Sequence, residues 1–321
     1  MITNKWTGEE FPADFIFPFY KVGQSGLNPT DFEYHNLIVK ILHEGVWKTN
    51  RTGVKTISIF GPQVEFHDVA NRFPLLTTKR VHLKSVIGEL LWFLEGSTDK
   101  TVLKEKYGVS IWDEWDAPHP KFNGDMGPIY GHQWVAWKDY KTRWVDAVSG
   151  PGMAVPLYIN QLQQTIDKLK NNPDDRRLIV SAWNVAELDE MALAPCHWSY
   201  QWESRQYPGE DRRRLNIKMN IRSWDIFLGG PFNIASYAVL LLMMAQEVNM
   251  IPGDLIISAG DVHIYENHLE YIYKQLQRES KTDEPIMKLN PNKGFWDFVP
   301  EDFTLENYDA HPNWKNVPVA I

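Results

Sequence analysis

The sequence is poor in cysteine, because Cys196 is the only one among 321 residues. A single thiol excludes an intrachain disulfide and a zinc site of the multi-cysteine kind, and we expect no metal. Cys196 follows Pro195 and precedes His197, and a neighbouring base or positive charge can hold a thiol as the nucleophilic thiolate. The commoner fate of a free cysteine is burial as a structural thiol. Residues 194–198 taken alone favour that second interpretation.

The sequence also lacks a membrane-directing signal and an excess of basic residues. Residues 1–14 are polar and mixed, and the longest apolar run, 234–245, is shorter than the ~20 residues needed to cross a bilayer. The net charge of −8 argues against nucleic acid as a substrate, since such binding rests on phosphate neutralisation. With one cysteine and no leader, we expect a soluble, cytoplasmic protein with no membrane partner.

What is present predicts an α+β fold. Apolar residues make up 43% of the chain and charged residues 23%, as in soluble globular proteins. Helical spacing marks residues 31–47, 83–94 and 159–170, and strict alternation marks a strand over 215–222. Because strands and helices do not alternate regularly, we expect a single α+β domain over residues 31–321, preceded by an irregular extension over 1–30.

Other segments carry weaker signals. Residues 139–157 are predicted to be a linker or variable loop, and 228–233 a turn before a buried helix that starts at Ile234. Residues 255–257 are predicted to be a strand, and 261–265 to lead into a helix around Asn267 and His268. Glu89 falls off the centre of its helix's apolar stripe, so periodicity predicts a solvated acid. Arg176 and Arg177 precede a predicted strand, where arginines are most often exposed but also suit phosphate recognition.

Several long motifs, in one order, resemble those of the thymidylate synthase family. The resemblance covers roughly Phe32 to Ile321. It is carried by Asn50-Arg51-Thr52-Gly53, Phe73-Pro74-Leu75-Leu76-Thr77-Thr78-Lys79-Arg80, Glu89-Leu90-Leu91-Trp92-Phe93-Leu94, Ile111-Trp112-Asp113-Glu114-Trp115, Ala194-Pro195-Cys196-His197, Arg222-Ser223-Trp224-Asp225, Pro231-Phe232-Asn233-Ile234-Ala235-Ser236-Tyr237, Gly260-Asp261-Val262-His263-Ile264-Tyr265 and Pro318-Val319-Ala320-Ile321.

The resemblance implies reductive methylation of dUMP to dTMP, with 5,10-methylene-tetrahydrofolate as co-substrate. It also implies a mixed twisted β-sheet flanked by helices, and a homodimer formed through the sheet face. In such a dimer, Arg176 and Arg177 would reach the phosphate in the partner's site.

The resemblance further implies three groups of site residues. The catalytic group is Cys196, Glu89, Tyr130, Asn233 and Asp225; the nucleotide-binding group is Arg51, Arg176, Arg177, Arg222, Ser223, Asn233, His263 and Tyr265; the folate-binding group is Lys79, Trp112, Asp225, Leu228, Gly229, Phe232 and Ile321.

Two positions depart from the family's pattern. Ile221 stands where glutamine is usual before Arg-Ser, and Gly230 stands where a larger apolar residue is usual. Ile221 either faces the core or alters the polar surroundings of the thiol, and Gly230 could loosen the folate side of the site. These departures keep open a dUMP 5-hydroxymethylase, which would let water capture the methylene intermediate. A catalytically inactive homologue that only binds is disfavoured by the full set of reactive residues.

Overall fold

The computed structural model describes residues 2–3, 8, 10–11, 26–113, 124–145 and 153–320. Its helices are α2 (Pro29–Glu44), α3 (Leu83–Leu94), α4 (Lys100–Tyr107), α5 (Tyr130–Ala136), α6 (Gln161–Asn171), α7 (Gly229–Glu247) and α8 (Leu269–Leu276). Its strands are β1 (Ile2–Thr3), β2 (Glu10–Phe11), β3 (Val46–Lys48), β4 (Thr56–Phe60), β5 (Gln63–Phe66), β6 (Trp137–Val145), β7 (Met153–Ile159), β8 (Ile179–Ser181), β9 (His197–Arg205), β10 (Arg214–Asp225), β11 (Ile251–Tyr265), β12 (Ile286–Leu289) and β13 (Phe303–Glu306).

A mixed sheet organises the chain. Its strands follow the order β3-β4-β11-β10-β9-β8, and β5 also pairs with β11. The central strands β10 and β11 run parallel, while their neighbours pair antiparallel. This mixed arrangement confirms the α+β prediction. It also brings the carboxyl ends of β10 and β11 to one edge of the sheet, where Asp225 pairs with His263.

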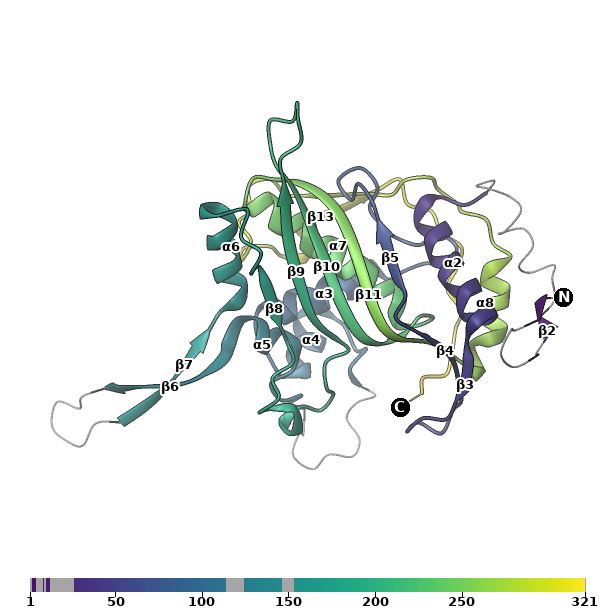
Figure 1. Ribbon diagram of the computed structural model, residues 1–321, viewed down its shortest axis with the longest axis horizontal. Coiled ribbons are helices and arrows are strands. Elements are labelled where there is room, and N and C mark those ends of the chain that lie inside the picture. The colour runs from purple at the N-terminus through teal and green to yellow at the C-terminus, as the bar shows by residue number, and fades with distance from the viewer. Residues whose placement is uncertain are drawn as a thin grey trace.

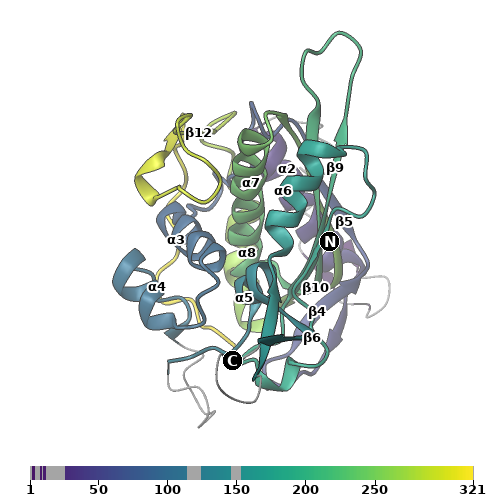
Figure 2. The same ribbon diagram turned by 90° about the vertical axis from the view of Figure 1, so that its left-hand side faces the viewer.

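One face of the sheet is covered by helices. Along β10 the residues Leu215, Ile217, Met219 and Ile221 are buried, and the residues between them are half-buried. This is the alternation that the sequence predicts for a strand with one face in the core. Against that face lies α7, whose burial on nearly all sides explains why its sequence is apolar without a stripe. Figure 2 shows α7 and α3 on the same side of the sheet.

The predicted helices are confirmed, with boundaries shifted by a few residues. Helix α2 begins after Asn28, whose side chain accepts the backbone N–H of Asp31, and Gly45 follows its last residue as the C-cap. Helix α3 covers the apolar stripe over residues 83–94. Among the described residues, no helix combines the length and the apolar character needed to cross a membrane.

Three predictions about local structure are wrong. Residues 139–145 and 153–157 are not a loop, because they belong to β6 and β7, which pair antiparallel (Figure 1). Helix α7 starts at Gly229, so the expected turn before Ile234 is already its first turn. Strand β11 is one continuous strand to Tyr265, far longer than the short strand predicted at residues 255–257. Helix α4 was not predicted.

Candidate active site

The single cysteine lies just before β9, where β10 approaches it. The Arg222 guanidinium donates hydrogen bonds to the carbonyl oxygens of Ala194 (2.7 Å) and Pro195 (2.9 Å), and its Nη2 lies 3.9 Å from Cys196 Sγ. The register of the β9–β10 ladder shifts between Asn220 and Ile221, an irregularity of the kind that often redirects a side chain next to an active site. The half-buried thiol therefore has a fixed positive charge beside it. Such a charge stabilises a thiolate.

Tyr130 holds the backbone of the cysteine from the other side. Its hydroxyl oxygen accepts the N–H of Cys196 at 2.9 Å. Tyr130 has a φ of +28°, which is unusual for a residue with a side chain. The next residue must be glycine, since a Cβ at Gly131 would lie 2.0 Å from the carbonyl oxygen of Phe93. This close approach of α5 to α3 fixes the tyrosine, and burial raises the pKa of its hydroxyl above the usual range.

Glu89 is not the solvated acid that periodicity predicts. It is half-buried on α3, and the indole N–H of Trp112 donates to its Oε1 at 2.7 Å. Burial raises the Glu89 pKa to about 7, against the opposing effect of the Trp112 hydrogen bond. Trp112 also packs edge-on against Tyr130, with ring centroids 5.9 Å apart. Glu89 therefore exchanges its proton near neutral pH close to Tyr130.

His197 has a structural role in this cluster. Its ring is stacked on Tyr130 at a centroid distance of 4.2 Å, and Nδ1 lies 2.9 Å from the hydroxyl of Tyr237. Burial lowers the His197 pKa to about 3, so the imidazole is neutral at physiological pH. The positive charge beside Cys196 is accordingly that of Arg222 and not that of the adjacent histidine.

Polar side chains gather where β10 and β11 end. Asp225 Oδ1 accepts the backbone N–H groups of Phe227 (3.0 Å) and Leu228 (3.2 Å), which shapes the turn into α7. His263 Nδ1 lies 2.8 Å from Asp261, which also pairs with Lys48. Ser223 is half-buried on the same stretch of β10.

Tyr265 is the last residue of β11 and lies at the same edge. Burial raises the Tyr265 pKa, the Asp225 charge adds to that rise, and the Arg51 charge opposes it. Arg51 thus lies within electrostatic range of the β11 terminus, although its own side chain is exposed.

The first turn of α7 follows directly on the turn that Asp225 shapes. Leu228, Gly229, Phe232 and Asn233 are all half-buried there, and a Cβ at Gly229 would lie 3.4 Å from Asn233 Oδ1. Within the described part of the chain, the Asn233 amide has no hydrogen-bond partner, so its donor and its acceptor are free for a ligand.

A model of the thymidylate synthase family matches residues 32–321. That range is most of the chain and includes every site residue described above. The chain belongs to the thymidylate synthase family. Membership supports a transferase of nucleotide biosynthesis that acts on dUMP with folate as its co-substrate.

Not every residue that the family resemblance assigns lies near the thiol. Arg176 and Arg177 are exposed before β8, and Arg177 bonds Asp175 at 3.1 Å. Because Ile179 pairs with Gln201, Arg177 lies beside the far end of β9, about seven residues or ~23 Å along the strand from Cys196. Ile321, assigned to the folate side, lies outside the described residues.

Lys79 is buried and faces the protein. Its ammonium donates to the carbonyl oxygen of Phe227 and lies 3.7 Å from the centroid of the Phe227 ring. Burial lowers the Lys79 pKa to about 7, and the charge of Asp225 opposes that shift. In this structure Lys79 therefore supports the turn that carries Asp225 and Leu228.

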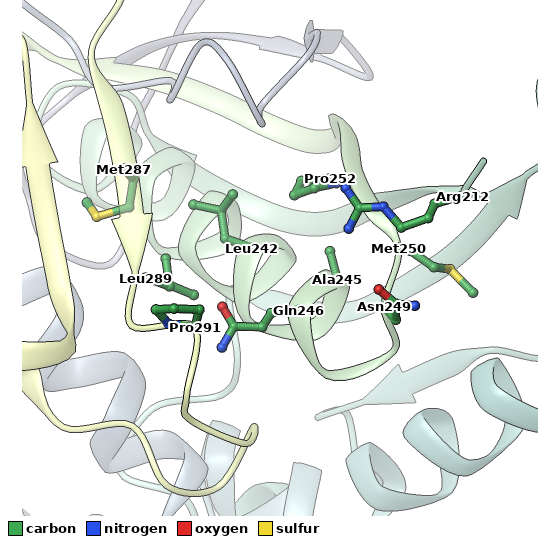
Figure 3. A pocket seen from close by; sticks show the side chains of 10 residues that line it. All are labelled: Arg212, Leu242, Ala245, Gln246, Asn249, Met250, Pro252, Met287, Leu289 and Pro291. Carbon is green, nitrogen blue, oxygen red and sulfur yellow. The ribbon is translucent and has the colours of Figure 1, made fainter. Parts of the chain in front are cut away.

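A cavity of about 430 Å³ lies away from these residues (Figure 3). It is formed at the C-terminal end of α7 by Leu242, Gln246 and Met250, with Met287 from β12. None of the assigned site residues lines it.

The family motifs leave one neighbour of Arg222 unassigned. The ring of Trp183 lies 5.6 Å from the guanidinium carbon of Arg222. The two residues are far apart in sequence and no periodicity links them, so only the folded chain reveals this cation–π contact.

Proposed function

We propose that this protein catalyses the reductive methylation of dUMP to dTMP. The observation that carries the proposal is the position of the Arg222 guanidinium, 3.9 Å from the sulfur of the only cysteine. The donor of the carbon and of the hydride would be 5,10-methylene-tetrahydrofolate. Glu89, Tyr130, Asp225 and Asn233 line the same region and provide the remaining chemistry.

In the first step, the Cys196 thiolate would add to C6 of the uracil ring. The C5–C6 π electrons then move toward O4 and make C5 an enolate-like nucleophile. Arg222 supports both requirements of this step, because its charge stabilises the thiolate and attracts the phosphate dianion of the nucleotide. The free amide of Asn233 offers a donor for O4 and an acceptor for N3–H.

Proton transfer would fall to Glu89 and Tyr130. After C5 has bonded to the one-carbon unit, its proton must leave so that the folate can depart and form the exocyclic methylene. A carboxyl with a pKa of about 7 holds and releases protons near neutral pH, directly or through water. The folate supplies the one-carbon unit and then the hydride, and expulsion of the thiolate from C6 completes the product.

On the folate side of the site, Asp225 would bind the pteridine. Asp225 uses Oδ1 for the turn amides, and among the described residues its Oδ2 has no hydrogen-bond partner. A carboxylate oxygen of this kind suits the N–H donors of a pterin ring. The apolar Leu228, Phe232 and Trp112 would contact the ring system.

A homodimer through the open face of the sheet would complete the site. Ile179, Gln201, Lys218 and Ile256 form a row across that face, and Ile179 is 51% exposed. If two chains related by a two-fold axis pack these sheet faces together, Arg176 and Arg177 of one chain would lie toward the thiol of the other. The distance of these arginines from Cys196 within one chain supports this arrangement.

The second candidate is a dUMP 5-hydroxymethylase, and Ile221 is the observation that favours it. This residue offers no hydrogen-bonding side chain where the family usually has glutamine. However, Ile221 is only 2% exposed and continues the apolar phase of β10. Gly230 does not loosen the site, because a Cβ there would already lie 3.0 Å from Ile226 and 3.6 Å from Tyr34. The packing around both positions therefore favours methyl transfer.

The test is the identity of the product. We expect mass spectrometry to show dTMP, accompanied by the absorbance of dihydrofolate. A product 16 Da heavier, with tetrahydrofolate left unoxidised, would instead identify the hydroxymethylase.

Substitution of the nucleophile tests the covalent mechanism. Cys196→Ser should lower turnover by roughly a thousandfold or more while retaining dUMP binding, because a hydroxyl is a far weaker nucleophile at neutral pH. Binding of dUMP, measured by calorimetry, is the control for folding of the variant. Turnover within about tenfold of the wild type would contradict the covalent step.

A further inference from the structure

His268 is fully buried between the site and the C-terminal segment. Its Nε2 lies 2.8 Å from the carbonyl oxygen of Pro318, and its Nδ1 lies 3.9 Å from Asp225 Oδ1. Within the described residues Nδ1 has no hydrogen-bond partner. One imidazole thus stands between the C-terminal segment and the carboxylate assigned to the folate.

The chemistry of the two contacts determines where the proton lies. A carbonyl oxygen only accepts, so Nε2 carries the hydrogen and donates it to Pro318. The distance from Nδ1 to Asp225 is too long for a hydrogen bond. The ring therefore donates its N–H to the C-terminal segment. The Asp225 oxygens remain available to accept hydrogen bonds from the turn and from a ligand.

The surroundings of His268 hold both the ring and the segment in place. The ring packs against Phe227 and edge-on against Tyr265, with centroid distances of 5.2 and 5.6 Å. Four residues before Pro318, Trp314 lies 5.7 Å from the Phe227 ring, and the Arg278 guanidinium lies 3.9 Å above the indole. Residues 314–318 consequently run along the turn that carries Asp225 and Leu228.

We infer that His268 is a positioning residue that fixes the C-terminal segment against the folate side of the site. The inference rests on the proposed function for what the segment covers, but not for the contact itself. A folate bound at Asp225 would then meet a segment already held in place. Nucleotide binding would depend little on this contact, because among the described residues the His268 ring meets that side at the Tyr265 ring.

Two amide variants separate the two nitrogens of the ring. In His268→Gln the amide nitrogen reaches close to the position of Nε2 and can still donate to Pro318. In His268→Asn the amide nitrogen lies near the position of Nδ1 and cannot reach Pro318. Both variants lose the aromatic ring, so the difference between them isolates the hydrogen bond to the segment.

The first readout requires no activity. Carboxypeptidase Y should release the last four residues of His268→Asn about three- to tenfold faster than those of His268→Gln, the range expected for the loss of one neutral hydrogen bond. The KM for methylene-tetrahydrofolate should rise by a similar factor in His268→Asn, while the KM for dUMP stays within about twofold.

The possible outcomes distinguish a failure of the His268 inference from a failure of the proposed function. Equal release rates in both variants and the wild type would overturn the role of His268, even if the enzyme makes dTMP. Faster release in His268→Asn, together with a wild-type protein that makes no dTMP, would support the role of His268 and refute the proposed function. If neither variant folds, ¹⁵N spectra of the wild-type histidines decide, since a proton on Nδ1 in place of Nε2 contradicts the inference.

Discussion

Glu89 shows how far one side chain can depart from what its sequence position suggests. Its pKa of about 7 lies above the ordinary value for a glutamate, because burial disfavours the charged form. The folded state therefore binds this proton more tightly than the unfolded state does. It follows that stability is lost as the pH rises from about 4.5 to about 7, and that the loss is complete above that range.

Glu89→Gln should remove this pH dependence, because the amide resembles the protonated acid. The free energy of unfolding of the variant, relative to the wild type, should increase by roughly 2–4 kcal/mol between pH 4.5 and pH 8. Urea titrations at several pH values measure it. Glu105→Gln on α4 is the control, since that side chain is exposed and stays in water in both states. A difference that does not vary with pH would refute the burial of a protonated acid.

The sequence could not predict this environment for Glu89. Periodicity locates a residue relative to its own helix, whereas the partner of Glu89 is Trp112, which follows α4. The same limit applies to His268, which the sequence showed only as part of a helix start. Both roles depend on contacts between segments that no local pattern connects.

Among the elements, α7 begins earlier than predicted, and its first turn is closely packed. Gly230 occupies that turn beside Ile226 and Tyr34. Gly230→Ala should change stability by less than about 1 kcal/mol, because better helix propensity offsets a contact with the flexible end of Ile226. Gly230→Leu should destabilise by about 1–3 kcal/mol through overpacking.

A second substitution tests whether contact with Ile226 is the cause of the destabilisation by Gly230→Leu. Ile226→Val removes the Cδ1 that the new side chain would meet, so Gly230→Leu should cost less in that background than in the wild type. Thermal or urea unfolding of the four proteins gives the coupling energy. Additive effects would show that Gly230 is small for another reason.

Local pattern was sufficient for some elements and insufficient for others. Strand β10 was predictable because its alternation reflects one buried face over the entire strand. The hairpin of β6 and β7 was not predictable. Most of it extends away from the body in Figure 1, and its sequence shows no alternation of apolar and polar residues like that of β10. The full length of β11 was also not predictable, because Gly253 and Gly260 lie within it and glycine is depleted in strands. Both glycines instead allow close approach to β10, where a Cβ would meet Asn216 and Arg222.

For the whole molecule, the separation of Arg177 from Cys196 along β9 leads to a test of subunit exchange. Arg177→Ala and Cys196→Ser chains should each be nearly inactive alone. Mixed and allowed to exchange, they should recover up to about a quarter of wild-type activity, because half of the dimers are hybrids and each hybrid has one complete site. Initial rates of dihydrofolate formation measure the recovery.

The matched control mixes Arg177→Ala with Arg176→Ala. Each hybrid site would then lack one arginine, so no activity should return. Recovery in this control, or none in the first mixture despite demonstrated exchange, would show that the arginines do not act across a shared interface. The overall fold was predictable from the motifs and the mixed secondary structure, but the sequence holds no direct signal for which chain supplies each arginine.

Because Cys196 carries the single thiol of the chain, chemical labelling of that thiol can be used to measure how many active sites are open. With one sulfhydryl per chain, every alkylation adds a single mass increment at a known position, and no other thiol needs correction. The extent of labelling then counts open sites, and the rate of labelling reports how readily a reagent reaches the sulfur. A ligand that covers the sulfur would register as protection, so occupancy could be followed on the intact protein without turnover.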